Sequence, residues 1–100
     1  MNTYILEVVQ SVDFEVAEHR AFLETRRIGL GDQLLEEIRA VFAQLKENPR
    51  IFQKRYGEFR LALTKHLRYK VIYHLKDEKT IRIVAIRHPR QHPTSWMERL

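Results

Sequence analysis

The chain has 100 residues, 44% of them hydrophobic, which suits one compact domain over residues 1–100. It contains no cysteine, which excludes disulfides, thiolate metal sites and a cysteine nucleophile. Its start lacks signal-peptide features, and no apolar run reaches the roughly 20 residues of a membrane helix, so we expect a soluble, cytoplasmic protein without a membrane partner.

The formal net charge of +5 is unevenly distributed along the chain. Residues 1–49 carry five Lys/Arg and nine Asp/Glu, whereas residues 50–100 carry thirteen and four, so the two halves balance to −4 and +9. A polyanion or an acidic protein segment is therefore expected to be attracted to the C-terminal half. The alternative is a solvated surface, because many small soluble domains are basic without binding anions.

The first predicted elements are a strand and a helix. Residues 3–9, TYILEVV, have the Ile, Val and Tyr content of a short strand. Ser11 fits the N-cap of a helix, with Asp13 and Glu15 in the first turn, where the helix dipole favours negative charge. The apolar residues of this helix form two stripes on nearly opposite sides, Phe14, Ala17 and Ala21 on one and Val12, Val16 and Leu23 on the other. We therefore expect the helix to be covered on both sides.

A second helix is predicted from about Asp32 to the residues before Pro49. Its apolar residues recur at three- and four-residue spacing on one face: Leu34, Leu35, Ile38, Val41, Phe42 and Leu45. The short glycine-containing connection RIGLGD predicts an antiparallel helical hairpin.

After Pro49 the apolar period changes from 3.6 to 2, which indicates strands. Residues 51–56 and 59–64 flank Gly57-Glu58 and predict a hairpin. Its second strand has Phe59, Leu61 and Leu63 on one face and Arg60, Ala62 and Thr64 on the other. Residues 68–75 alternate in the same way, and residues 80–88 are apolar enough on both faces for a central strand.

This order predicts an α+β fold, in which an N-terminal strand and a hairpin of two helices pack on one face of an antiparallel β-sheet. Large apolar residues should meet the helices. The uncovered face would then present cations, drawn from Arg60, Arg68, Lys70, His74, Arg82 and Arg87. A solvated polar sheet face is the alternative.

Three kinds of chemistry fit the basic half. In RNA cleavage, His88 and His92 would transfer protons while Arg60, Arg68, Arg87 and Arg90 hold phosphate, although such residues are more often solvated. A metal site at His88 and His92 is disfavoured, since Pro89 and Pro93 break any helix and no carboxylate is close; we predict no metal and no cofactor. In protein recognition, Trp96 is a clamp on the domain or a hot spot for a partner, with Arg87, Arg90 and Arg99 facing acidic groups.

The run RLALTKHLRYKVIYHLKDEKTIRIVAIRHPRQHPTSWMERL resembles the C-terminal half of the RelE/ParE toxin superfamily, in particular its ParE-like branch of plasmid stabilisation proteins. The positions that carry the resemblance are Arg60, Tyr69, Val71, Tyr73, Ala85, Ile86, His88, Arg90, Pro93, Trp96 and Arg99. FLE at 22–24 and LKENP at 45–49 extend it over nearly the whole chain. The resemblance implies the same order of strands and helices.

The resemblance also implies the toxin of a type II toxin-antitoxin pair, neutralised by a cognate antitoxin. ParE-type members are associated with poisoning DNA gyrase, and RelE-type members with cutting mRNA on the ribosome. RelE-type nucleases use a late tyrosine or histidine; here all tyrosines precede the tail, whereas His88 and His92 keep the nuclease alternative open. Pro89 stands where relatives often have glycine, which would aim the tail differently.

Three hypotheses for the function follow, and residues are assigned to catalysis, to target binding and to antitoxin binding. A gyrase-binding toxin that is not an enzyme is the preferred hypothesis, an endoribonuclease using His88 and His92 the first alternative, and a non-toxic antitoxin-binding relative the second. The residues expected to bind the target or nucleic acid are Arg60, Arg68, Arg87, Arg90, Trp96 and Arg99. The stripe Val12, Val16 and Leu23 is expected to face the antitoxin.

Overall fold

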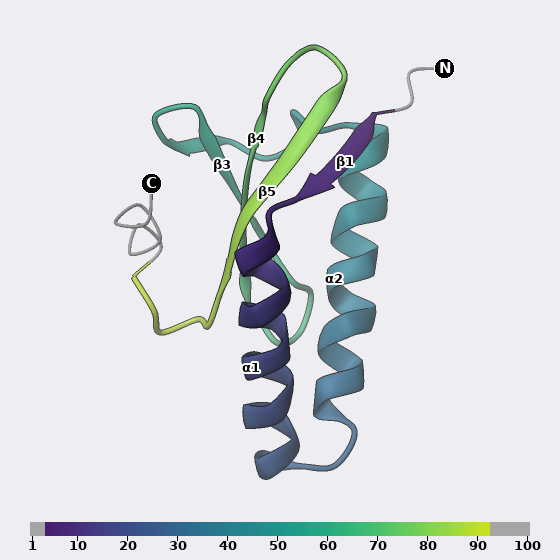
Figure 1. Ribbon diagram of the computed structural model, residues 1–100, viewed down its shortest axis with the longest axis vertical. Coiled ribbons are helices and arrows are strands. Elements are labelled where there is room, and N and C mark those ends of the chain that lie inside the picture. Colours follow the sequence, from purple (N-terminus) through teal and green to yellow (C-terminus); the bar gives the residue numbers. More distant parts are fainter. Residues whose placement is uncertain (1–3, 93–100) are drawn as a thin grey trace.

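The computed structural model describes residues 4–92 (Figure 1). Its elements are β1 (Ile5–Val8), α1 (Gln10–Arg26), α2 (Leu30–Glu47), β2 (Lys54–Tyr56), β3 (Phe59–Leu63), β4 (Lys70–Leu75) and β5 (Thr80–Arg87). The five strands form one sheet in the order β1-β5-β4-β3-β2. The predicted α+β class is confirmed, with one difference: β1 runs parallel to β5, so the sheet is mixed rather than wholly antiparallel. None of the described helices is long and apolar enough to span a membrane.

The helical hairpin is held by polar contacts at its turn. Gly29 has φ 95°, a left-handed conformation that favours glycine. The Glu24 carboxylate accepts hydrogen bonds from the backbone N–H groups of Gly29 (3.1 Å) and Gly31 (2.9 Å), which satisfies donors at the start of α2. Arg20 and Asp32 form an ion pair of 3.1 Å between the helices. The prediction of an antiparallel hairpin is therefore confirmed.

The predicted N-cap at Ser11 is wrong. Helix α1 begins at Gln10, its N-cap is Val9 in an extended conformation, and no side chain caps it. The N–H of Val9 donates to Ile83 O at 3.1 Å, so the pairing with β5 continues to the first residue before the helix. The sheet rather than a polar cap therefore sets where α1 starts.

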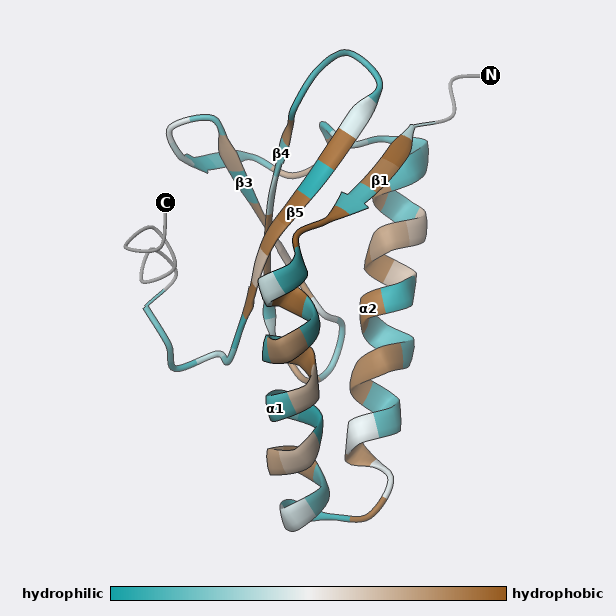
Figure 2. Cartoon of the chain, viewed as in Figure 1, coloured by the Kyte–Doolittle hydropathy of each residue, from teal (hydrophilic) through white to brown (hydrophobic). Residues whose placement is uncertain are grey.

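The main core lies between the helical hairpin and one sheet face. It includes Leu34, Ile38, Val41 and Leu45 of α2 and Val71, Tyr73, Ile81, Ile83 and Ile86 of the sheet. In Figure 2 hydrophobic residues dominate β5, and hydrophilic ones fill the turn before it. The single apolar stripe of α2 was enough to predict its buried face.

The predicted alternation along β3 is confirmed, but the prediction that its large apolar residues face the helices is wrong. Arg60 pairs with Tyr73 and Ala62 with Val71, and directly paired residues share a face, so Arg60 and Ala62 lie on the helix side. Phe59 and Leu61 lie on the opposite face, where they pack against a second buried cluster of Ile72, Val84 and Ala85. Both faces of the sheet bury apolar side chains, so large residues alone did not identify the helix side.

Candidate functional site

Strand β1 pairs with only the first part of β5. Helix α1 covers the edge of the remaining part of β5. β1 pairs with β5 only as far as Ile83. Farther along β5, the Glu15 carboxylate accepts a hydrogen bond from the N–H of Ile86 (3.3 Å), and His19 Nε2 lies 2.7 Å from Ile86 O. Because a carbonyl oxygen can only accept, His19 must donate through Nε2. Two α1 side chains thus replace a missing strand at the point where the chain leaves the sheet.

An ion pair strengthens this junction. Arg87 Nη1 lies 3.0 Å from Glu15 Oε2, and the two side chains are only 12% and 9% exposed. Arg87 is one of the cations that the sequence predicts to bind the target. In the structure its guanidinium already has a partner inside the protein, so little of it is presented to a ligand.

Residues 88–91, which we call the exit turn, are fixed by local hydrogen bonds. The Gln91 side-chain oxygen accepts from the N–H of His88 (2.7 Å), and the N–H of Gln91 donates to His88 O (2.9 Å). Lys70 Nζ of β4 donates to Gln91 O (3.0 Å). Arg90, Gln91 and His92 are exposed. The turn is therefore a positioned, solvent-facing structure, as rigid proline-containing turns often are.

Aromatic rings pack against His88 of the exit turn. The His88 ring lies 5.4 Å from the Tyr69 ring and 5.9 Å from the Phe22 ring, both edge to face. The His19 ring also packs edge to face on Tyr69, with ring centroids 4.9 Å apart. Histidines from α1 and from the exit turn thus meet on a buried tyrosine.

The surroundings of His88 are poorly suited to proton transfer. Burial, followed by the nearby charges of His19 and Arg90, lowers the pKa of His88 below its ordinary value of 6.5, so it is neutral at pH 7. Its Nδ1 accepts the N–H of Arg90 at 3.0 Å, which assigns the proton of the neutral ring to Nε2. Nδ1 is therefore occupied as an acceptor, and a general base would need that lone pair.

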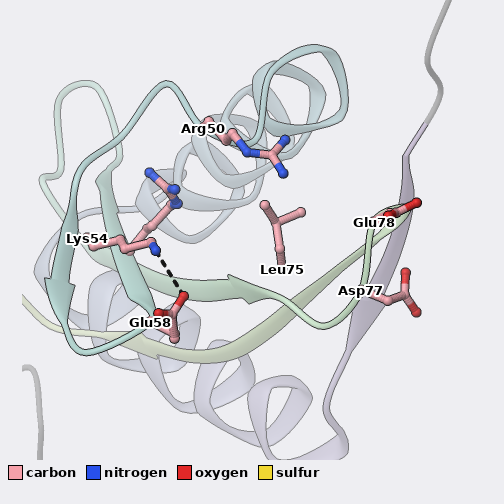
Figure 3. Close-up of a pocket in the computed structure, with 7 residues that line it drawn as sticks. Arg50, Lys54, Glu58, Leu75, Asp77 and Glu78 are labelled. Atoms are coloured by element: carbon pink, nitrogen blue, oxygen red, sulfur yellow. Dashed lines mark ion pairs between the residues drawn. The ribbon is translucent and has the colours of Figure 1, made fainter.

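Arg60 lies away from the exit turn. Its Nη1 donates to Phe52 O at 2.6 Å, and it lines a hollow near the β2–β3 hairpin. Figure 3 shows this hollow, with Arg50 and the Lys54–Glu58 ion pair (2.9 Å) on one side and Asp77 and Glu78 on the other. Cations and carboxylates are mixed here, which does not match the cationic sheet face expected around Arg60.

The face opposite the helices is only partly the cationic surface that the sequence predicts. Lys70, His74 and Arg82 lie on it, but Arg82 Nε pairs with Glu7 at 2.7 Å and Lys76 Nζ approaches the same carboxylate at 3.5 Å. The His74 ring packs on Phe59 at 4.8 Å. Apolar packing and ion pairs therefore occupy much of this face.

The two stripes of α1 have the reverse of their expected exposure. Val12 and Leu23 are buried core residues and Val16 packs against that core, so the prediction that they form a partner-facing surface is wrong. The other stripe is the outer one: Phe14 is 65% exposed, and Ala17 and Ala21 are also exposed. Helical spacing alone gave two equivalent stripes, and only the position of the sheet distinguishes them.

The remaining predicted residues do not form one group. Arg68 is exposed in the β3–β4 turn with φ 60°, apart from the strands, whereas Arg90 is exposed on the exit turn. Trp96 and Arg99 lie outside the described residues. Their expected roles therefore stay predictions.

Residues 14–93 match the family described as ParE toxin of type II toxin-antitoxin system, parDE. The chain belongs to this ParE toxin family. It is thus a type II toxin, a family role that implies an antitoxin partner. No curated protein matches the chain.

Two residues that organise this ParE toxin's β5 junction, Glu15 and His19, are not predicted from the sequence. Glu15 and His19 are four positions apart and so project from the same side of α1. Glu15 was explained by the helix dipole and His19 had no assigned role. The available signal was that these two polar residues flank the apolar stripe of α1 that faces the core.

Proposed function

We propose that this ParE toxin inhibits growth by binding and poisoning DNA gyrase in the cytoplasm, and that a cognate antitoxin neutralises it. The target contact is made by the exit turn with Arg90 and by the segment that follows it, including Trp96 and Arg99. In this proposal the toxin is a binding protein rather than an enzyme.

The observation that carries the proposal is the state of the exit turn. It is held by four hydrogen bonds, to Gln91 Oε1, His88 O, His88 Nδ1 and Gln91 O, and it presents Arg90 to solvent. A preorganised cationic surface suits binding, because little conformational entropy is lost on association.

The ribonuclease alternative is less well supported. In it His88 or His92 exchanges a proton near neutral pH, but the lowered pKa keeps the His88 ring neutral and its Nδ1 already accepts a hydrogen bond. The arginines expected to hold phosphate are also separated, with Arg60 bonded to Phe52 O near the β2–β3 hairpin and Arg87 paired with Glu15.

The test combines cells and purified components. The protein is induced without antitoxin, and DNA breaks, the SOS response and mRNA integrity are followed in the same culture. We expect DNA damage with intact mRNA, and inhibition of purified gyrase that falls about tenfold in Arg90→Glu. Arg39→Glu, an exposed charge reversal on α2, is the matched control and should behave as wild type.

His88→Gln and His92→Gln together separate the two mechanisms, because glutamine keeps a hydrogen-bond acceptor but cannot transfer a proton at neutral pH. Toxicity within about threefold of wild type is expected from a binding mechanism. Cleaved mRNA in the wild type, abolished by either substitution, with gyrase unaffected, would refute gyrase poisoning.

A further inference from the structure

The sheet face opposite the helices has an apolar row at its centre. Ile72 of β4 pairs with Leu61 of β3 on one side and with Ala85 of β5 on the other. The pairing of β4 with β5 then skips Val84, which packs in the same cluster as Ile72 and Ala85. Because directly paired residues share a face, these side chains form one row across three strands. We call Leu61, Ile72, Val84 and Ala85 the apolar row.

The apolar row is buried although both helices pack on the other face. Ile72 and Ala85 are 0% exposed and Val84 is 7% exposed. In the part of the chain that the structure describes, the partly buried apolar residues that pack against them are Phe59 and Leu61, both from β3. An uncovered face of an antiparallel sheet usually carries polar side chains. Complete burial of its central residues is therefore typical of a face that another segment covers.

Polar side chains border the apolar row on both sides along β4. Lys70 lies two residues before Ile72, and His74 lies two residues after it. His74 pairs with Arg82, whose Nε lies 2.7 Å from a carboxylate oxygen of Glu7. Two residues of a strand span about 7 Å, so the apolar surface is little more than one row wide. It suits one large apolar side chain better than the face of a partner helix.

The chain leaves the sheet next to this row. Lys70, the first residue of β4, pairs with the last residue of β5, and its Nζ donates to Gln91 O at 3.0 Å. This contact holds the exit turn at the same end of the sheet. The following residues, 93–100, have the sequence PTSWMERL, and we call them the tail. Trp96 follows Gln91 by five residues, a length of chain that spans up to about 17 Å, so the apolar row is within its reach.

We infer that the tail folds back over this sheet face and that Trp96 packs on the apolar row. A tryptophan side chain buries about 150–250 Å², which matches a surface one row wide. The tether favours this occupant over a second copy of the chain, because a segment attached through a short linker has an effective concentration of about millimolar. The packing belongs to the free toxin and does not depend on the identity of its target.

This anchor gives Trp96 a positioning role in the proposed target contact. Arg99 follows Trp96 by three residues, so a fixed indole ring restricts where the Arg99 guanidinium can lie. A tail that is held in place before association loses less conformational entropy when it binds. Trp96 then acts through Arg99 rather than by touching gyrase, and this step alone rests on the function proposed above.

The first test is the fluorescence of the full chain, in which Trp96 is the only tryptophan. We expect native emission at a shorter wavelength than in urea, with weak quenching by acrylamide. Leu61→Asp places a carboxylate in the apolar row and, with its folding verified by circular dichroism, should move the emission to the urea value. Ile28→Asp, at a 91% exposed position between the helices, is the matched control and should emit as wild type. Solvent-like emission in the folded wild type would overturn the inference.

A cross-link tests the same contact without introducing a charge. The chain has no cysteine, so Leu61→Cys/Met97→Cys contains only the two introduced thiols. A disulfide needs Cα atoms within about 7 Å, so on oxidation we expect an intramolecular bond at least about tenfold faster than in Ile28→Cys/Met97→Cys. Equal rates in the two variants would contradict the packing. Disulfide-linked dimers as the main product would assign the apolar row to a second copy of the chain instead.

Stability and gyrase inhibition separate the anchor from the proposed target. Trp96→Ala should lower the melting temperature by at least about 8 °C, whereas Trp96→Phe keeps an aromatic ring and should retain most of the stability and of the gyrase inhibition. Arg99→Ala should reduce gyrase inhibition and leave the emission of Trp96 unchanged. An unchanged melting temperature in Trp96→Ala would count against the anchor. A packed Trp96 in a wild type that has no effect on gyrase would support the anchor and refute only the proposed target.

Discussion

Two buried tyrosines differ in how their hydroxyl groups are satisfied. Tyr73 donates to Pro49 O at 2.7 Å, whereas the Tyr69 hydroxyl has no hydrogen-bond partner among residues 4–92. Burial raises the pKa of both, that of Tyr73 to about 12, so both are neutral phenols at pH 7. The ring of Tyr69, rather than its hydroxyl, carries its contacts with His19 and His88.

The two Tyr→Phe substitutions should therefore have opposite effects. Tyr73→Phe leaves the Pro49 carbonyl without its donor and should cost about 1–2 kcal/mol of unfolding free energy. Tyr69→Phe removes an unsatisfied buried hydroxyl and should be neutral or stabilising by up to about 1 kcal/mol. Thermal melting measures both, at about 4–8 °C per kcal/mol for a domain of this size. Equal destabilisation of the two variants would contradict this account.

The Glu15–Arg87 pair is the other residue-scale determinant of the β5 junction. Glu15→Ala leaves a mostly buried guanidinium without its carboxylate and removes the acceptor for the Ile86 N–H, so we expect a loss of about 2–4 kcal/mol. Glu15→Ala/Arg87→Ala should lose less than the sum of the single variants, because no charge is left buried alone. Urea unfolding of the double-mutant cycle measures this coupling, and additive effects would argue against it.

At the scale of elements, the sequence predicts some features well and others not at all. The single stripe of α2 identified its buried residues, because one apolar face has only one way to pack. The succession of helices and strands along the chain was also predictable from the change of apolar period, whereas the parallel pairing of β1 with β5 was not. The orientation of β3 was not, because Phe59 and Leu61 pack on a second cluster while Arg60 reaches a loop carbonyl. The contacts of Glu15 and His19 with β5 depend on where β1 ends, and no local sequence pattern indicates that position.

A single carboxylate joins α2 to the β3–β4 turn. Glu37 accepts hydrogen bonds from the N–H groups of His66 (2.9 Å) and Leu67 (3.0 Å) and from the Gln33 side chain (2.8 Å). Burial raises the pKa of Glu37, but these hydrogen bonds outweigh it, so its pKa lies below the ordinary 4.5. The ionised form is thus the one that stabilises the fold.

Glu37→Gln should therefore destabilise the protein most at neutral pH. Because the folded pKa is lowered, the contribution of Glu37 is present above about pH 4.5 and is lost as the pH falls through the folded value. We expect a loss of about 1–2 kcal/mol at pH 7 that shrinks below pH 4. Glu36→Gln, an exposed neighbour on α2, is the control. A difference independent of pH would show that the charge is not involved.

At the scale of the whole molecule, the segregation of charge was visible in the sequence but its placement was not. The basic C-terminal half contributes Arg60 to a mixed-charge hollow, Arg82 to an ion pair with Glu7 and Arg90 to the exit turn. These positions are spread over the strands and the exit turn of one small domain. Net charge therefore predicts attraction to polyanions, whereas it does not locate a site.

Two histidines, His74 on β4 and His88 in the exit turn, should make the whole fold sensitive to mild acid. Burial is the main cause that lowers the pKa of both His74 and His88. The charge of Arg82 lowers the pKa of His74 further, whereas Glu7 and Glu58 raise it. The charges of His19 and Arg90 lower the pKa of His88 further. Their folded pKa values lie below the unfolded value of about 6.5, so the unfolded chain binds protons first as the pH falls. The melting temperature should consequently be constant above about pH 7 and decrease as the pH falls from about 6.5 toward the folded values. His74→Gln/His88→Gln should flatten this decrease, while His66→Gln, at an exposed position, should retain it. A double variant whose melting temperature falls as steeply as that of the wild type between pH 7 and pH 5.5 would rule out these two side chains as the cause.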